Sequence, residues 1–445
     1  MTDTRPSVQI AGNRLVPQHI QIEGGAYGSV GDATIRVSMS ALDAAGIDLF
    51  DIAAQAPGST QVLVNVSQDG GAPVRIFGGE YKSTAFDHDA DQIVIHARSW
   101  AGVLADQKRV LTQIASAIET ATAPLVPGQV LNAQGVATEN QKVGQIVTAI
   151  AAEFGFTPVL NIQAANNPTF GALYGTSDTA FVPSPRSLWE ILVDLARDTG
   201  YEVYVTPNKA LVFGAAGAGL TPIALSYNVA ASNQALPCGN LVIDHHPRRN
   251  STFRVLVISY DAGRSQTTIG RTVFVSPEFA GSRGSVSVPT GNVITSPSAA
   301  GAPTTTTAAA TLQAGLQSGP AALRAEQIIA SLNASQQQVP LYTFHVDGLS
   351  ADQAQQRADA IATDIAKRHL ILHCRTDGLP GILPTNPLRL SGAVRSSFTA
   401  NPWYVASYTH TIAMPKGQGD NQAAGWWTEI TALDLPTTNL GSTSE

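Results

Sequence analysis

Charged side chains are scarce in this sequence of 445 residues. They make up 13% of the chain, against about 25% in typical soluble proteins. The 26 Lys and Arg are outnumbered by 33 Asp and Glu, which gives a net charge of −7. Tight binding to a phosphate backbone needs an excess of basic side chains, so this balance argues against a dedicated nucleic-acid reader. The uncharged polar surface favours large subunit contacts, because amides and hydroxyls that find partners cost less to desolvate than ions.

Cysteine is almost absent. The two cysteines, Cys238 and Cys374, lie far apart and form no Cys-x-x-Cys pair, so a disulfide framework and a thiolate zinc site both lack ligands. This usage predicts a reducing compartment. No stretch reaches the roughly 18 uninterrupted apolar residues of a membrane span, and residues 1–6 contain no apolar signal-peptide core. We therefore expect no membrane-spanning segment and no secretion by that route.

Aromatic residues are missing between Phe279 and Tyr342, where Ser, Thr, Ala, Gly and Pro dominate. A segment of this composition has too little apolar surface to offset its ordering entropy alone. We predict that residues 280–340 form an extension that is flexible or ordered by a partner, with one short helix from Ala321 to Leu332.

Short runs of alternating apolar residues fill the part before Trp100. The clearest expected strands are Ile35 to Ser40, Gln61 to Val66, Val74 to Phe77 and Gln92 to Ala97. Their apolar residues fall largely at every second position, between breaks that suit tight turns. Residues 1–105 are therefore predicted to form an all-β domain, either a barrel or a curled sheet.

Helical spacing begins after this domain. Residues 106–220 are predicted to form a small α/β insert of two helix-to-strand units at a constant offset of 45, so that Val143 aligns with Leu188 and Gly155 with Gly200. The first helix is expected within Asn140 to Phe154, and the second to open at Ser184-Pro185, with serine as N-cap and proline in the first turn. The expected strands are Phe156 to Leu160, Tyr201 to Val205 and Ala210 to Phe213.

A second β domain is predicted in two pieces. Residues 221–279 begin it, with the apolar run Phe253 to Tyr260, and residues 341–435 complete it, before a flexible tail at 436–445. A capping box at Ser350 precedes a helix whose narrow alanine stripe suits close packing on a sheet. The remaining expected strands are Ile371 to Arg375, Leu388 to Ser391, Tyr404 to Ile412 and Trp426 to Leu433.

Few residues suggest chemistry. The candidates are His369 with His373 and Cys374 as half a metal site, and Asp244-His245-His246 and Asp87-His88-Asp89 as carboxylate-oriented imidazoles. The run after His369 reads as the start of a strand, which splays the two rings, and adjacent residues on a strand rarely face each other. No nucleophile signature is present. We therefore expect no catalytic, cofactor-binding or metal-binding residues, and no cofactor.

Other clusters have plain structural interpretations. The glycine sets Gly25, Gly28, Gly31 and Gly214, Gly217, Gly219 lack the strand, glycine and helix order of a phosphate loop, so they predict turns. Arg248-Arg249 is interpreted as an edge guard or an interface anchor. Trp403, Trp426 and Trp427 are interpreted as core or subunit-contact residues, with a stacking platform for sugars or bases as the alternative.

Several segments, taken in order, carry a family resemblance. They are Arg75 to Tyr81, Ile95 to Trp100 with Leu104, Ser187 to Leu192 with Leu195 to Arg197, Gly200-Tyr201 and Leu211 to Phe213, Asp347 to Ser350 with Ala354 and Arg357-Ala358, Leu383 to Leu388, and Tyr404 through His410 to Trp427-Thr428. The set resembles the baseplate hub proteins of contractile-tailed phages, the tail protein D-like or late control family, which is related to the N-terminal hub part of type VI secretion spike proteins. The resemblance spans residues 8 to 433.

This resemblance implies an α+β fold that is mainly β, with two tube-like β-barrel domains, a small α/β insert and a trimeric pseudo-sixfold ring. It implies a structural baseplate hub, not an enzyme, that joins the hexameric tail tube to the trimeric central spike and leaves a lumen for DNA in transit. The implied partners are the homotrimer, the tail tube protein, the central spike protein, and baseplate wedge and tape measure proteins. The implied location is the tail baseplate of the virion, after assembly in the host cytoplasm. No spike repeats or lysozyme module follow the second barrel, so the expectation is a separate hub.

Two alternatives from other classes stay open. A tail-tip cell-wall hydrolase needs two carboxylates about 5 to 9.5 Å apart in a cleft. A glycan-binding tail-tip protein would use the C-terminal tryptophans. The acidic net charge fits a conduit, since a wall that holds phosphates tightly slows their passage.

Overall fold

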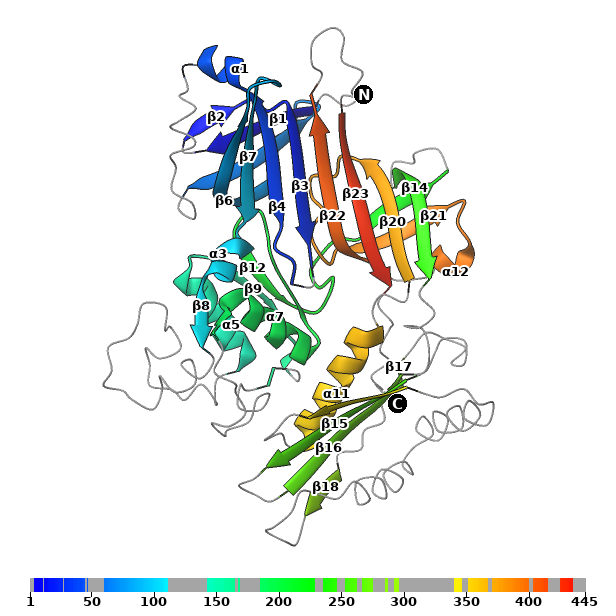
Figure 1. The fold of residues 1–445 in the computed structure, drawn as a ribbon. Coiled ribbons are helices and arrows are strands. Elements are labelled where there is room, and N and C mark those ends of the chain that lie inside the picture. Colours follow the sequence, from blue (N-terminus) through cyan, green and yellow to red (C-terminus); the bar gives the residue numbers. More distant parts are fainter. Residues whose placement is uncertain are drawn as a thin grey trace, which may run out of the picture.

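The fold is mainly β and is built from four parts, which the computed structural model places as in Figure 1. The structure describes residues 4–10, 12–26, 28–44, 46, 60–110, 142–164, 167–168, 185–228, 235–245, 253–261, 266–274, 285–286, 292–295, 340–345, 351–366, 370–399, 403–414 and 425–434. Within these ranges no helix combines the length and the apolar character needed to cross a membrane.

The first part, here called the front barrel, comprises residues 4–99. Its strands are β1 (Thr4–Ile10), β2 (Asn13–Leu15), β3 (His19–Gly25), β4 (Asp32–Ser38), β5 (Gln61–Gln68), β6 (Val74–Asp87) and β7 (Gln92–Ser99), and helix α1 (Met39–Ala44) follows β4. Side chains at alternate positions, such as Ile20, Ile22, Ile93 and Ile95, fill its core with almost no exposed surface. The alternating pattern thus produces the expected β domain, and α1 was not expected from the sequence.

The second part, here called the rear barrel, comprises residues 223–245 and 370–434. Its strands are β13 (Ile223–Tyr227), β14 (Leu236–His245), β20 (Leu370–Asp377), β21 (Pro387–Gly392), β22 (Trp403–Ala413) and β23 (Gly425–Asp434), with the short helix α12 (Ser396–Thr399) before β22. β22 pairs with both β21 and β23, and β13 with both β21 and β14, so six strands close into a barrel.

The two barrels share one strand order. The front barrel, β2 aside, runs β1-β5-β6-β7-β4-β3, and the rear barrel runs β13-β21-β22-β23-β20-β14. When the six strands of each barrel are numbered in chain order, the order across the sheet in both barrels is first, fourth, fifth, sixth, third, second. In both barrels four neighbouring pairs are antiparallel: the fourth strand with the fifth, the fifth with the sixth, the sixth with the third, and the third with the second. They differ at the first strand, since β1 is antiparallel to β5 whereas β13 is parallel to β21. Among the described residues, the first and second strands pair with each other in the rear barrel but not in the front barrel.

The third part is the insert, which follows helix α3 (Ala101–Asp106). It contains β8 (Lys108–Val110), α5 (Val143–Glu153), β9 (Thr157–Asn161), β10 (Pro185–Ser187), α7 (Leu188–Thr199), β11 (Glu202–Val205) and β12 (Ala210–Gly214). The two helices bury the stripes aligned at offset 45, and Gly155 and Gly200 adopt φ of 65° and 72° after them, as left-handed caps do. The expected start of the second helix was wrong. Pro185 pairs with β8, and Ser187 caps α7 in a capping box with Glu190.

The fourth part, here called the outer sheet, contains β15 (Phe253–Asp261), β16 (Gln266–Phe274), β17 (Ser285–Val286), β18 (Asn292–Thr295), β19 (Leu341–His345) and helix α11 (Ala351–Ala366). Ala354, Ala358 and Ala362 pack on Phe253 and Val255, so the alanine stripe lies on a sheet as expected. A Cβ at Gly270 would overlap the backbone of Ala354, which explains how α11 can lie so close to β16.

The outer sheet corrects one expectation about the rear barrel. The run from Phe253 to Tyr260 belongs to this separate sheet, because β15 pairs with β16 and β19 and with no barrel strand in the described chain. Two short pieces of the expected extension, β17 and β18, pair with β16. The expected helix from Ala321 to Leu332, the capping residue Ser350 and the tail at 436–445 lie outside the described residues.

Candidate functional site

The front and rear barrels are joined edge to edge through β3 and β22. The two strands are antiparallel, and seven residue pairs run from Gly25 opposite Ser407 to His19 opposite Ala413. The Ala26 amide continues the ladder by donating to the Ala406 carbonyl at 2.7 Å. This pairing, here called the seam, makes one sheet of 13 strands across both barrels. In Figure 1 the seam is where the blue β3 arrow meets the orange β22 arrow.

A glycine and an aromatic ring meet directly across the seam. Gly24 lies opposite Tyr408, and a Cβ at Gly24 would overlap the tyrosine ring. The ring therefore occupies the space that a side chain would take, which protects the strand backbone that glycine leaves bare. Tyr408 is buried, and this burial raises the pKa of its hydroxyl. The seam thus requires a residue without a side chain at position 24.

The rear barrel also completes the core of the front barrel. Ile412 and Trp426, from β22 and β23, pack within the same apolar cluster as Ile20 and Ile35 of the front barrel. Beside them lies His410, which is 1% exposed and whose Nδ1 is 2.9 Å from the Thr428 hydroxyl. Burial lowers the pKa of His410 to about 3, so the imidazole stays neutral at neutral pH. Apolar packing and main-chain pairing together hold the two barrels in one orientation.

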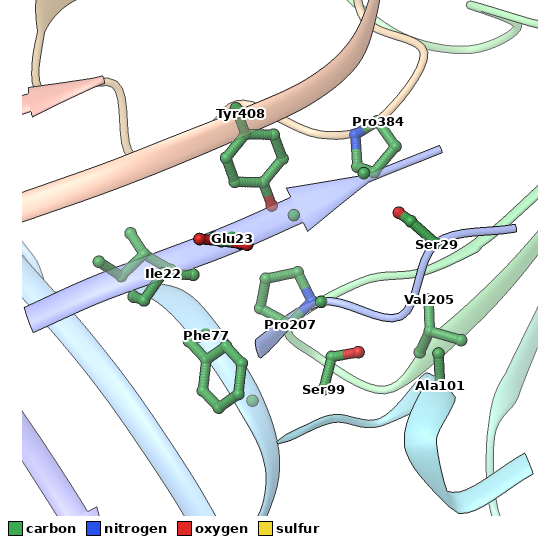
Figure 2. Close-up of a pocket in the computed structure, with 15 residues that line it drawn as sticks. Ile22, Glu23, Ser29, Phe77, Ser99, Ala101, Val205, Pro207, Pro384 and Tyr408 are labelled. Carbon is green, nitrogen blue, oxygen red and sulfur yellow. The ribbon is translucent and has the colours of Figure 1, made fainter. Parts of the chain in front are cut away.

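The insert meets both barrels next to the seam. Figure 2 shows Glu23, Phe77 and Ser99 of the front barrel, Val205 and Pro207 of the insert, and Pro384 and Tyr408 of the rear part around one small cavity. Its volume is about 30 Å³, whereas ligand pockets usually measure about 300 to 1,000 Å³. The Trp189 and Trp100 indoles donate to the Gly28 and Pro207 carbonyls at 2.9 and 3.1 Å, which fixes the insert against the front barrel. The junction is a packed structural joint and has no room for a substrate.

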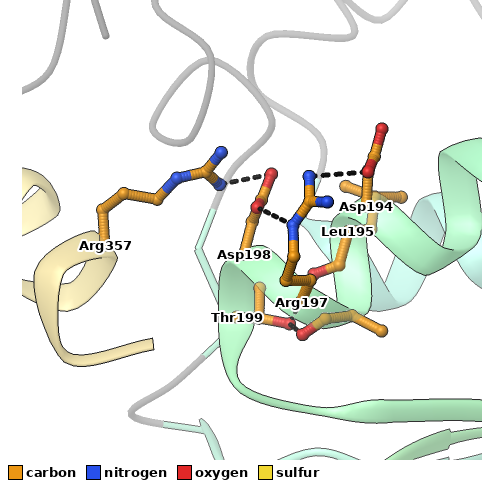
Figure 3. Close-up of polar contacts among 7 residues, drawn as sticks. Asp194, Leu195, Arg197, Asp198, Thr199 and Arg357 are labelled. Carbon is orange, nitrogen blue, oxygen red and sulfur yellow. Dashed lines mark hydrogen bonds and ion pairs between the residues drawn. The ribbon is translucent and has the colours of Figure 1, made fainter. Parts of the chain in front are cut away.

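A buried ion cluster connects the insert to the outer sheet. Asp198 of α7, whose side chain is 2% exposed, forms an ion pair with Arg357 of α11 and lies 3.5 Å from the Arg197 Nε (Figure 3). Arg197 also contacts Asp194 at 2.6 Å. Two guanidinium groups around one buried carboxylate offset part of its desolvation cost. This contact, here called the α7–α11 link, orients α11 and the outer sheet on the insert.

Among the described histidine and carboxylate candidates, only His373 and Asp244 come together, across the pairing of β14 with β20. His373 and Cys374 lie on opposite faces of β20, and the His373 ring contacts Thr431 at 3.1 Å and Asp244 at 3.6 Å on the half-exposed face. Asp87 accepts a hydrogen bond from the Ala90 amide at 3.0 Å in an exposed turn. His369 and His246 lie outside the described residues, as do Arg248-Arg249, and nothing is described of the His245 side chain. No cluster of metal-ligating side chains occurs among the residues that the structure describes.

Four of the six glycines lie in connections between strands, as expected, whereas Gly25 and Gly214 are the last residues of the strands β3 and β12, so the expected turn was wrong for these two. Gly28 and Gly31 belong to the connection between β3 and β4, and their carbonyls accept from Trp189 and from the Ser99 amide. Gly217 and Gly219 have φ of 73° and 74° in the connection from β12 to β13. Positive φ favours glycine at Gly28, Gly217 and Gly219, while a Cβ at Gly31 would overlap the Glu23 carbonyl, so local structure accounts for these residues.

The C-terminal tryptophans do not form a platform. Trp403 is fully buried in the rear core, where its indole donates to the Phe398 carbonyl at 2.9 Å, and Trp426 packs into the front core. Trp427 stacks under the Arg375 guanidinium at 4.4 Å. The core interpretation is therefore confirmed for two of the three.

The two cysteines, far apart in sequence, are neighbours in the rear core. Cys374 donates a hydrogen bond to the Cys238 sulfur, which lowers the pKa of Cys238, while the same contact and burial raise the pKa of Cys374. Cys238, Arg375, Asp377 and Trp427 line an open groove of about 540 Å³ at the start of β14. The sequence spacing gave no sign of this contact, because it arises from pairing of β14 with β20.

The seam itself was not anticipated from the sequence. Gly24 carries no signal beyond turn propensity, and Tyr408 lies in an ordinary alternating strand. Their contact joins residues almost 400 positions apart, so local pattern could not have identified it. The repeated strand order could have been found only after the strand pairings were known.

Comparison with known proteins supports this architecture at the level of fold. No protein-family model and no curated protein sequence matches the chain. Among solved structures it is similar to a tail protein from Neisseria meningitidis MC58, with a TM-score of 0.55 and 13% identity over 97% of this chain and 96% of that one. It is also similar to a 43 kDa tail protein of prophage MuSo2 from Shewanella oneidensis, with a TM-score of 0.52 and 11% identity over 98% and 100%. The chain therefore shares the fold of these two tail proteins.

Proposed function

We propose that this protein is a structural hub of a phage tail or a related injection machine. Three copies form a ring that joins a six-membered tail tube to a threefold central spike, and the ring leaves a channel for DNA. The hub acts in the virion baseplate after assembly in the host cytoplasm, and its further partners are wedge and tape measure proteins. The shared fold with two tail proteins supports this role.

The observation that carries the proposal is the repeated strand order in two barrels joined by the seam. A chain with two barrels of matching order can present two similar surfaces. Three such chains supply six barrels, which matches a sixfold partner on one side while keeping threefold symmetry on the other. The proposal keeps the expected limits of the first barrel, residues 1–105, and of the insert, residues 106–220. It replaces the expected second barrel, residues 221–279 and 341–435, by residues 223–245 and 370–434.

The chemistry of the junction supports a mechanical role without enzymatic activity. The seam is built from main-chain hydrogen bonds, a glycine under a tyrosine ring and apolar packing. Its one buried imidazole, that of His410, is held neutral at neutral pH and bonded to Thr428. These groups hold the front and rear barrels in one orientation, and the cavity beside them is too small for a polymer or a metabolite.

The test is the mass of the purified full chain in solution. Mass photometry at nanomolar concentration, with light scattering at micromolar concentration, should find particles of three chain masses. Addition of the cognate tail tube protein should then shorten the lag of tube polymerisation. Monomers alone at micromolar concentration, or unchanged tube kinetics with a trimer present, would contradict the role as a hub.

A further inference from the structure

The two cysteines of the rear barrel lie on neighbouring strands. β14 and β20 are antiparallel, with Cys238 opposite Thr376. The Thr376 hydroxyl donates to the Pro237 carbonyl at 2.9 Å, which holds the start of β14 against β20. The Cys374 thiol donates a hydrogen bond to the Cys238 sulfur, and both side chains belong to the buried cluster of the rear core. Two free thiols are therefore in contact across a pair of strands.

A bulge in β14 allows the two sulfur atoms to approach each other. The register changes between Gly239 and Val242, so that two residues of β14 face Cys374 alone. One of these two residues, Asn240, has a φ of 51°. A disulfide bond is about 2.05 Å long, so the hydrogen-bonded sulfurs must move closer to form it. A Cβ at Gly239 would meet no atom within 4 Å, so the backbone beside Cys238 can adjust without a clash.

The two thiols differ in their access to solvent and in their acidity. Cys238 is 7% exposed and lines the open groove of about 540 Å³ at the start of β14, whereas Cys374 lies behind it in the core. The hydrogen bond from Cys374 lowers the pKa of Cys238, while the same bond and burial raise the pKa of Cys374. Since the thiolate is the nucleophile, an oxidant in the groove meets the more reactive sulfur first and has a second thiol directly behind it.

We propose that Cys238 and Cys374 form an oxidation site, at which a hydroperoxide creates a disulfide between β14 and β20. The Cys238 thiolate attacks one peroxide oxygen, the O–O bond breaks, and the other oxygen leaves and takes up the proton that the thiol released. Cys238 is then a sulfenic acid. Cys374 attacks the Cys238 sulfur, the S–O bond breaks, and the hydroxyl leaves with the Cys374 proton as water. The two thiols together lose two electrons, which reduce one hydroperoxide.

The disulfide joins the second and third strands of the rear barrel. It also encloses the outer sheet, whose elements lie between the two cysteines in the chain. A cross-link stabilises mainly by restricting the unfolded chain, and more so when the closed loop is long. The thiols persist in a reducing compartment, and the bond forms when the chain meets an oxidising one. The inference goes beyond the proposed function, because no step of it depends on a ring or on a tail tube.

Peptide mapping of the oxidised full-length chain tests the site. The reduced chain is treated with hydrogen peroxide, the remaining thiols are blocked with N-ethylmaleimide in denaturant, and the chain is digested without reductant. A peptide that joins Cys238 to Cys374 within one chain should appear, and dithiothreitol should separate it. Disulfides only between copies, or a sulfinic acid at Cys238 without the joined peptide, would overturn the proposal.

Two serine variants form a matched pair of controls. In Cys374→Ser the reaction should stop at the sulfenic acid of Cys238, so that dimedone labels this residue at least tenfold more than in the wild type. In Cys238→Ser the remaining Cys374 thiol should be oxidised at least tenfold more slowly than the Cys238 thiol of Cys374→Ser. Equal rates would contradict the role of Cys238 as the attacking thiol. Mapping of the wild type decides whether the disulfide forms even where a variant fails to fold.

Hydrogen exchange of the oxidised and reduced wild type measures the effect on the rear barrel. Peptides from β14 and β20 should exchange at least tenfold more slowly after oxidation, and dithiothreitol should restore the faster rate. Peptides from β5 and β6 of the front barrel should not change. A joined peptide with unchanged exchange in β14 and β20 would refute the stabilising effect of the disulfide.

Discussion

Substitution of Gly24 by alanine should open the seam. Alanine normally stabilises a strand position relative to glycine by about 0.5 to 1 kcal/mol. Here its Cβ would overlap the Tyr408 ring, and overpacking of this kind costs about 1 to 3 kcal/mol. We therefore expect Gly24→Ala to be destabilising, whereas Gly381→Ala should not be, because a Cβ at Gly381 meets no atom within 4 Å. The two substitutions are chemically identical, so the sign of the effect reports the contact.

Hydrogen exchange read by mass spectrometry measures this effect locally, which suits a chain of several parts that will not unfold in one step. Peptides from β3 and β22 should exchange about tenfold faster for each 1.4 kcal/mol lost, while peptides from the outer sheet should not change. In a double-mutant cycle, Tyr408→Leu should relieve much of the cost of Gly24→Ala. Equal exchange rates in Gly24→Ala and Gly381→Ala would refute the contact between Gly24 and the Tyr408 ring. Strictly additive effects of Gly24→Ala and Tyr408→Leu in the cycle would refute it as well.

Three further predictions concern buried polar groups. An unfolded imidazole titrates near 6.5 and buried His410 near 3, so the unfolded state binds the proton first and stability falls as the pH drops below 6.5. Between pH 7 and 5 the wild type should lose about 2 kcal/mol more unfolding free energy than His410→Gln. Hydrogen exchange of β22 peptides at both pH values, corrected for the intrinsic exchange rate, measures this loss, and parallel losses in the two proteins would contradict it. Arg357→Met should destabilise the α7–α11 link by about 3 kcal/mol, because it leaves the Asp198 carboxylate under-compensated; adding Asp198→Leu should recover at least half, as measured by exchange in α11, and no recovery would argue against the ion pair. Iodoacetamide should alkylate Cys238 at least tenfold faster than Cys374 in the folded chain, since Cys238 lines the groove and has the lowered pKa; peptide mass spectrometry gives both rates, and equal rates would exclude this difference.

Local pattern predicted the elements well where burial alternates strictly. The strands around Ile35, Val62 and Ile95 and the paired helices at offset 45 occur as expected, because each must bury one face. The run from Phe253 to Tyr260 has the same apolar signature as a barrel strand, yet it joins the outer sheet. Composition identifies such a strand as buried but does not select its neighbour, since that choice depends on contacts across the fold.

The candidate site was harder to foresee for the same reason. Trp403 and Trp426 were correctly interpreted as core residues, because large aromatics in alternating strands bury their rings. Gly24 and Asp198 gave no such sign. Their roles come from partners in distant segments, Tyr408 on β22 and Arg357 on α11. Sequence reasoning could identify the two β domains, while the seam between them required the pairing of strands.

Electron cryo-microscopy of the assembled full-length chain tests the central claim most directly. Matching strand order in the two barrels predicts a hollow ring of six similar densities with true threefold symmetry, in which front and rear barrels alternate and superpose through their second to sixth strands. An assembly in which the two barrels occupy unlike positions, or one without a central channel, would contradict it.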